Sequence, residues 1–146
     1  MSDGDGRSDS VLYERRGTVG VMTLNRPDRM NAMDQAMLLE IDRVATIAES
    51  DHETHAVVLT GAGKGFSSGF DLKAQAANTP VGVDQWREPL RRDFDAVMRF
   101  WHMRKPTIAA VHGPALPIGI LKAICKVSEC RCLAGEAGKS RPNRRS

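Results

Sequence analysis

Residues 55–72 read His-Ala-Val-Val-Leu-Thr-Gly-Ala-Gly-Lys-Gly-Phe-Ser-Ser-Gly-Phe-Asp-Leu, and this stretch decides the fold class. Residues 55–60 form a short apolar run of the kind that is buried in a parallel sheet. Residues 61–65 are rich in glycine, which predicts a loop directly after the strand. A buried strand that leads into a loop of small residues indicates an α/β protein in which a ligand can approach the backbone.

The same strand–loop unit recurs further along the chain. Lys105-Pro106 ends a helix, residues 107–111 predict a second buried strand, and His112-Gly113-Pro114 stops it. A second amphipathic helix is expected over residues 88–104, after a loop-like excursion at residues 74–89. Its expected inward residues are Leu90, Phe94, Val97, Met98 and Trp101, and its expected solvent-facing residues are Arg91, Arg92, Arg99 and Arg104.

Upstream, the sequence predicts a hairpin and a first helix. Residues 11–16 and 18–24 are β-type runs broken at Gly17, and Pro27 lies just beyond the second run. Asp34 can cap a helix that runs to about Ser50. Its expected buried stripe is Met37, Leu38, Ile41, Val44, Ala45 and Ala48, with Glu40, Asp42, Arg43 and Glu49 on the other side.

Two loops are candidates for a binding site, residues 65–72 and the segment that begins at His112. Each follows a predicted buried strand, and small residues let a ligand approach backbone N–H groups closely. If the loops face each other, two N–H groups can point at one oxygen and form an oxyanion hole. Tight turns without any such role are the alternative interpretation of the same spacing.

Three motifs then carry a resemblance to a known family. Leu24-Asn25-Arg26-Pro27 precedes Asn31-Ala32-Met33, Val58-Leu59-Thr60-Gly61 precedes residues 66–72, and residues 105–116 read Lys-Pro-Thr-Ile-Ala-Ala-Val-His-Gly-Pro-Ala-Leu. In order and spacing they resemble the enoyl-CoA hydratase/isomerase (crotonase) family. The resemblance implies an α/β fold, a crotonase-like spiral of ββα units that is incomplete at the C-terminus. It also implies an acyl-CoA thioester substrate whose carbonyl lies between two backbone N–H groups.

The resemblance assigns roles to individual residues. The N–H of Ser68 takes the place of the first oxyanion donor, and Ile118 takes the place of the second. Leu121 stands where hydratases carry a catalytic Glu, and leucine cannot transfer a proton. For Arg26 and Arg29, a solvated loop charge is an equally good interpretation. The expected residues for binding coenzyme A are Arg26, Arg29, Ala32, Ser68, Gly69, Phe70, Asp71, Leu72, Gly113 and Leu116. Coenzyme A is then part of the substrate, with no further cofactor.

The family pattern changes after Leu116, where the run Pro117-Ile118-Gly119-Ile120-Leu121 replaces a glycine-rich segment. Residues 117–146 hold seven Lys or Arg and two acids, a net charge of +5, so the whole-chain charge of +3 leaves −2 for residues 1–116. We therefore expect a flexible leader at 1–10, a core at 11–116 and a divergent, poorly ordered basic tail at 117–146. A frameshifted or truncated gene product is one hypothesis for this tail, and a divergent family member is the other.

Composition argues against several other functions. All three cysteines lie in the tail, and the spacing of Cys130 and Cys132 does not suit a zinc site. The basic tail has no stacking aromatics, which argues against nucleic-acid recognition. No run approaches a membrane span, and no signal peptide is visible, so a cytoplasmic location is expected. The resemblance implies a homotrimer or hexamer, and we expect the C-terminal part that builds it to be absent from this sequence.

Two classes of function remain open. The first is an enzyme of acyl-CoA and fatty acid metabolism, a lyase by resemblance, whose catalysis is impaired by the loss of catalytic Glu residues. The second is a non-catalytic protein that binds acyl-CoA or a partner. The residues that choose among the family's reactions are changed or missing, so the particular acyl-CoA and reaction are not readable.

Overall fold

The computed structural model describes residues 9–77 and 82–115, which form a sheet with helices on one face. The sheet has four strands in the order β1 (Val11–Arg16), β2 (Val19–Leu24), β3 (Ala56–Gly61) and β4 (Thr107–Ala109). Strand β1 pairs with β2 antiparallel, and the other neighbouring strands are parallel. The predicted hairpin is confirmed, with Gly17 at its turn in the left-handed region at a φ of 62°.

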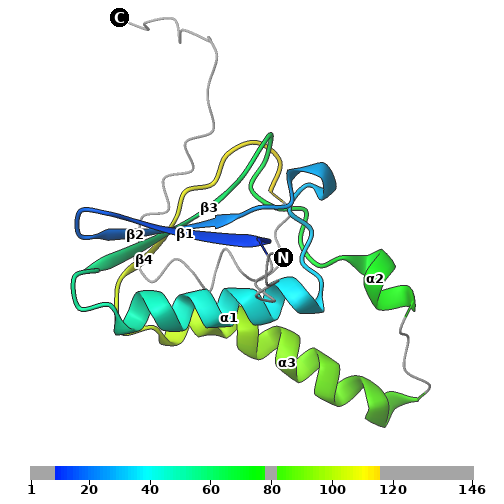
Figure 1. Cartoon of the computed structure of the whole chain (residues 1–146). Coiled ribbons are helices and arrows are strands. Elements are labelled where there is room, and N and C mark those ends of the chain that lie inside the picture. The colour runs from blue at the N-terminus through cyan, green and yellow to red at the C-terminus, as the bar shows by residue number, and fades with distance from the viewer. Residues whose placement is uncertain (1–8, 78–81, 116–146) are drawn as a thin grey trace, which may run out of the picture.

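Helix α1 (Gln35–Ser50) covers one face of this sheet (Figure 1). It begins as predicted, because the carboxylate of Asp34 accepts a hydrogen bond from the backbone N–H of Met37 at 3.0 Å. The predicted apolar stripe is buried along its whole length, against core strand residues that include Met22, Leu24, Val57 and Leu59. On β2 alternate residues are buried, and the residues between them are half-buried.

In α1, one position was predicted wrongly. Glu40 was expected on the solvent side but is only 8% exposed. Its carboxylate pairs with Arg43 one turn along the helix, with an N–O distance of 2.6 Å. The charged partner compensates the burial, so a carboxylate can lie at the edge of the apolar stripe.

The segment between β3 and β4 differs most from the prediction. Helix α2 (Leu72–Ala77) and the first turn of α3 (Val83–His102) occupy the expected excursion, so α3 begins five residues earlier than predicted and contains Pro89. The face of α3 that packs inward also differs from the predicted one. Asp93, Phe100 and the following Met103 are buried, whereas Leu90, Phe94 and Trp101 are exposed. Met98 of the predicted stripe is half-buried against the core and confirms the prediction in part, while the side chain of Val97 is not described.

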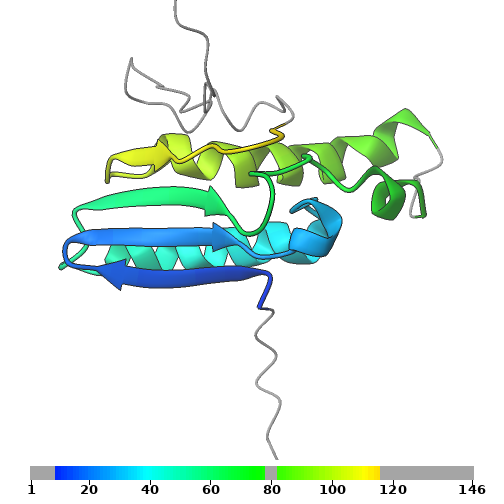
Figure 2. The ribbon, with the colours of Figure 1, turned by 90° about the horizontal axis from the view of Figure 1, so that it is seen from above.

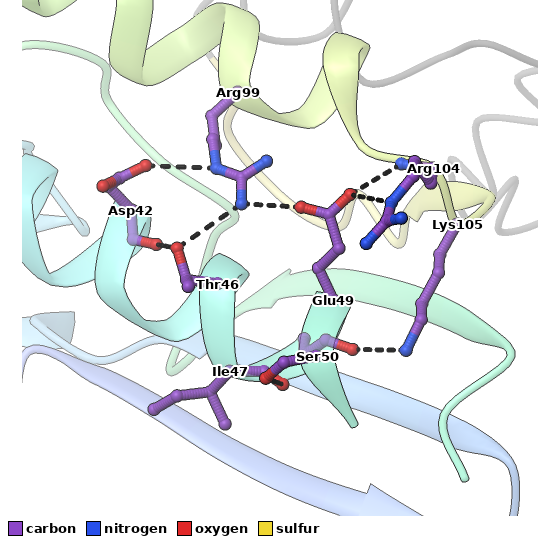
Figure 3. A network of polar contacts seen from close by, with 9 residues as sticks. Asp42, Thr46, Ile47, Glu49, Ser50, Arg99, Arg104 and Lys105 are labelled. Atoms are coloured by element: carbon purple, nitrogen blue, oxygen red, sulfur yellow. Dashed lines mark hydrogen bonds and ion pairs between the residues drawn. The ribbon is translucent and has the colours of Figure 1, made fainter. Parts of the chain in front are cut away.

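An ion-pair network joins α3 to the end of α1 (Figure 3). Arg99, expected to face water, places its guanidinium 3.1 Å from Asp42 and 2.8 Å from Glu49. The backbone N–H of Arg104 and the side chain of Arg99 lower the pKa of Glu49 below its ordinary value. A lowered carboxylate pKa means that the ionised form stabilises the fold, an effect lost when acid protonates Glu49. Lys105 continues the network by donating to the Ala48 carbonyl at 2.7 Å.

The chain advances along the sheet as a spiral, with one turn for each of the parallel strands (Figure 2). Successive turns are held together beyond the strands: Ala62 N–H donates to Leu24 O, and Ala110 N–H donates to Leu59 O, both at 2.8 Å. Each strand is therefore followed by a segment that stacks on its counterpart from the previous turn. This stacking positions the candidate site.

Candidate functional site

The two small-residue loops lie side by side at the same end of the sheet. The segment after β3 meets the segment after β4 through a parallel bridge between Ser67 and Ala115. The N–H of Phe66 also donates to the carbonyl oxygen of His112 at 2.9 Å. The two loops therefore lie against each other, and the convergence of two of their N–H groups on one oxygen stays a prediction.

A third segment joins them from the first turn. Met33 forms a parallel bridge with Phe70, and the Met33 N–H donates to Gly69 O at 2.8 Å. The Asp71 N–H then donates back to Met33 O at 2.8 Å. The three sequence motifs thus form consecutive layers of one stack.

Asn31 is the residue at the centre of this stack, and it was not among the predicted site residues. Its side chain is fully buried, and its amide nitrogen lies 2.9, 3.0 and 3.1 Å from the carbonyl oxygens of Ala62, Gly65 and Phe66. Its amide oxygen accepts from the backbone N–H of Arg26 at 2.8 Å. A polar residue inside a motif flanked by apolar residues was the available signal, because a buried amide needs several partners.

Ser68 lies in the predicted loop, but its N–H is already engaged. It donates to the carbonyl oxygen of Met30 at 2.8 Å. A ligand oxygen at this N–H would have to replace that carbonyl, so the role of Ser68 as an oxyanion donor stays a prediction. The other predicted members of the catalytic region, Ile118 and Leu121, and the binding residue Leu116 lie outside the described residues.

A cavity of about 570 Å³ lies beside the stack, between the first-turn segment and the loop after β3. Its lining combines apolar, backbone and charged groups, as binding sites for medium-sized ligands do. Leu72 is 72% exposed there, which is unusual for a large apolar side chain. The lining residues are Asp28, Arg29, Ala32, Ser68, Phe70, Asp71, Leu72 and Lys73, so most of the predicted binding residues come together here.

Asp71 has a structural task at the edge of this cavity. Its carboxylate accepts from the Ala74 N–H at 3.1 Å, one turn into α2. That hydrogen bond lowers the pKa of Asp71, and the positive charge of Arg29 acts in the same direction against the effect of burial. Asp71 is therefore held as an anion that orients α2, because negative charge is favoured at a helix N-terminus.

The two arginines near the entry motif have different surroundings. Arg26 is largely buried and binds the Asp34 carboxylate and, at 3.1 Å, the Ala32 carbonyl, so it braces the start of α1. Arg29 lines the cavity, and its side chain is 60% exposed with Asp71 at 3.5 Å. Of the two, Arg29 can reach a bound phosphate, whereas Arg26 is committed within the fold.

Two predicted binding glycines have left-handed backbones. Gly69 has a φ of 88° and Gly113 a φ of 57°, a region that costs other residues energy. A Cβ on Gly113 would collide with the carbonyl oxygen of Lys64, and one on Gly65 would lie 2.8 Å from Pro114 O. The glycines therefore allow the two loops to touch backbone to backbone. Gly113 does not line the cavity, which leaves close packing as its visible role.

Some groups are not found in the described part of the chain. Residues 9–77 and 82–115 contain no cluster of three His, Cys, Asp or Glu side chains able to hold a metal ion. Among the helices in those same residues, none is both long enough and apolar enough to cross a membrane.

The expected leader lies mostly outside the described residues, but the Ser10 carbonyl accepts a 2.7 Å hydrogen bond from the Asn25 N–H.

A parallel-stranded spiral with stacked backbone loops after its strands defines the class of protein as crotonase-like. The chain belongs to the enoyl-CoA hydratase/isomerase family, whose model matches residues 14–129. The match thus extends past residue 116, the expected end of the family-like core.

Known proteins of this family resemble the chain in sequence and in structure. A crystal structure of an enoyl-CoA hydratase/isomerase from Xanthobacter autotrophicus Py2 is 59% identical, with a TM-score of 0.69 over 72% of this chain and 39% of that one. A Shewanella pealeana enoyl-CoA hydratase superposes with a TM-score of 0.71 over 80% of this chain and 43% of that one, at 28% identity. Enoyl-CoA hydratase EchA19 of Mycobacterium tuberculosis is 36% identical over 133 residues, 88% of this chain.

The shared length is limited on the relatives' side. The chain spans between 43% and 47% of the length of eight curated relatives. The similarity therefore concerns less than half of each of these relatives.

Proposed function

We propose that this chain binds the coenzyme A part of an acyl-CoA thioester in the cavity between residues 28–32 and 68–73. The observation that carries the proposal is the convergence of predicted binding residues from two spiral turns on one cavity. Family membership supports the same substrate class, because relatives are enoyl-CoA hydratases by name.

The charges and the exposed leucine of the cavity suit the parts of coenzyme A. Arg29 and Lys73 in its lining offer positive charge to partly hydrated phosphate groups, and Asp28 and Asp71 balance that charge within the same lining. Leu72 offers an exposed apolar surface to an adenine ring or to the pantetheine arm. The thioester oxygen would be bound by the Ser68 N–H after it exchanges the Met30 carbonyl for the ligand.

We expect Arg29→Ala to weaken the affinity for free coenzyme A about fivefold, because an exposed charge contact contributes up to about 1 kcal/mol. Titration calorimetry at two salt concentrations measures this, and the loss should shrink at high salt, where exposed charges are screened. Arg91→Ala is the matched control, since Arg91 is an exposed arginine of α3 outside the cavity. Equal effects of both substitutions, or no binding of coenzyme A, would contradict the proposal.

Hydration of crotonyl-CoA by this chain should be about 10²–10⁴-fold slower than at ordinary hydratase rates, since one missing acid/base group has that effect. The reason is Leu121, which stands where the resemblance places a catalytic Glu. The decay of the enoyl thioester absorbance gives the rate. Leu121→Glu should raise it by returning a proton-transfer group, with Leu121→Gln as the control. Turnover of the unmodified chain at about 1–10³ s⁻¹ would show that another group transfers the proton.

The same two experiments separate the alternatives. Binding of coenzyme A with slow turnover that Leu121→Glu raises identifies an enzyme whose catalysis is impaired, and binding without measurable turnover identifies a non-catalytic acyl-CoA-binding protein. Binding with normal turnover identifies an enzyme of acyl-CoA metabolism.

A further inference from the structure

A second cavity, of about 430 Å³, adjoins the first one between the beginning of α1, helix α2 and the first half of α3. Asp71 lines both cavities, so they meet at the N-terminus of α2. One wall is apolar and includes Trp86 and Leu90. A ligand held in the first cavity therefore lies next to a second space that is partly open and more apolar than polar. The volume suits the tail of a small organic molecule.

A polar pair interrupts this apolar wall. Asp93 is only 8% exposed, and one oxygen of its carboxylate accepts from the Gln75 side-chain amide at 3.2 Å. Both residues line the cavity. A carboxylate has about four acceptor positions, so beside this bond to a described residue Asp93 can accept from a ligand as well. A hydrocarbon end placed against it would instead withdraw the carboxylate from water without a compensating bond, which is unfavourable.

The other acids of the lining have stronger internal partners. Asp34 binds the Met37 N–H and the guanidinium of Arg26, and Asp71 binds the Ala74 N–H near Arg29. Asp93 has a neutral amide as its partner instead. The exposed Arg92 also lines the cavity, so the preference does not come from its total charge. It comes from Asp93 itself, because a buried carboxylate favours a neighbouring ligand group that donates hydrogen bonds or carries positive charge and disfavours a second carboxylate.

From this geometry we infer that the second cavity takes the far end of the acyl chain, and that Asp93 and Gln75 select chains that end in a hydroxyl or an amine. The inference rests on the proposed binding of acyl-CoA and names its substrate class. A site that hydrogen-bonds a hydroxyl discriminates strongly against the analogue that lacks it, because its polar group is then left without a partner. Asp93 is thus a specificity-determining residue rather than a catalytic one.

Titration calorimetry with matched ligands tests the inference. The ligands are butanoyl-, hexanoyl- and octanoyl-CoA, the ω-hydroxy, ω-amino and ω-carboxy derivative of each, and free coenzyme A. We expect at least one ω-hydroxy and one ω-amino thioester to bind about tenfold more tightly than the plain thioester of equal length, as one hydrogen bond to a charged group allows. The ω-carboxy thioesters should bind more weakly than the plain ones.

Variants of α3 show whether Asp93 causes the preference. Asp93→Leu should abolish the preference for both donor groups and leave the affinity for free coenzyme A unchanged. Asp93→Asn, which keeps the size and an acceptor but removes the charge, should abolish mainly the preference for the amine. Asp95→Asn is the control, because Asp95 is an exposed acid of the same helix that pairs with Arg91. Thermal melts of all variants identify any that fail to fold.

The outcomes distinguish this inference from the proposed function. If plain and donor-bearing thioesters bind equally at every length while coenzyme A binds, the selectivity is wrong and the proposed function stands. If the preference persists in both Asp93 variants, the assignment to Asp93 is wrong. If neither coenzyme A nor any thioester binds, both fail together.

Discussion

Asn31→Ala is expected to lower the free energy of unfolding by about 3–5 kcal/mol, because each buried group left without its partner costs about 1–3 kcal/mol. The amide of Asn31 binds the carbonyl oxygens of Ala62, Gly65 and Phe66 inside the stack, where water cannot replace it. Domains have only about 5–15 kcal/mol of stability, so much of the fold's stability depends on this side chain. Urea unfolding followed by circular dichroism gives the difference.

Two further variants make this prediction specific. Asn25→Ala is the control, since Asn25 has a similar bond to the Asp9 carbonyl near the surface and should lose about 0.5 kcal/mol or less. Asn31→Gly removes the amide but suits the left-handed backbone at Asn31, where φ is 52°. If Asn31→Gly is as stable as the unmodified protein, backbone conformation rather than the amide explains the loss.

Gly113→Ala should destabilise the chain by about 2–5 kcal/mol, the sum of about 1–2 for a left-handed alanine and about 1–3 for overpacking. The new methyl group would collide with the Lys64 carbonyl and force the loops apart. Gly17 provides a matched control, because its φ of 62° is similar to the 57° of Gly113 but its Cβ would meet open space. Gly17→Ala should therefore show the conformational cost alone.

Hydrogen exchange reports whether the loops separate. The amide of Phe66 donates to His112 across the two loops, so its exchange should accelerate in Gly113→Ala and stay unchanged in Gly17→Ala. Similar losses of stability in both variants, with normal protection of the Phe66 amide, would mean that the two loops have room for the added methyl group.

Elements with strong local signals were predicted from the sequence. Helix α1 follows from the Asp34 cap and its apolar periodicity, and the hairpin follows from alternation around Gly17. Strands β3 and β4 follow from apolar runs bounded by glycine and proline. In each case the signal, whether a cap, an alternation or an apolar run, lies within one stretch of the chain, so it is visible in the sequence.

Local sequence patterns did not predict which face of helix α3 is buried. Its sequence has two stripes at helical spacing, one through Leu90 and Phe94 and another through Asp93 and Phe100. Hydrophobicity favours the first, but packing on α1 and the ion pairs of Arg99 bury the second. Which face a helix buries depends on its neighbours, and those are set by the fold.

For the site, the sequence by itself determined the motifs, their order and most of the residues that line the first cavity. Only the tertiary structure decided which backbone groups are engaged: the Ser68 N–H binds Met30, Arg26 binds Asp34, and Asn31 holds the layers together. Arg26 and Asp34 are 8 positions apart in the sequence, and Ser68 and Met30 are 38 positions apart. Hydrogen bonds of this kind form only when the spiral stacks one turn on another, and no local pattern of residues encodes that contact.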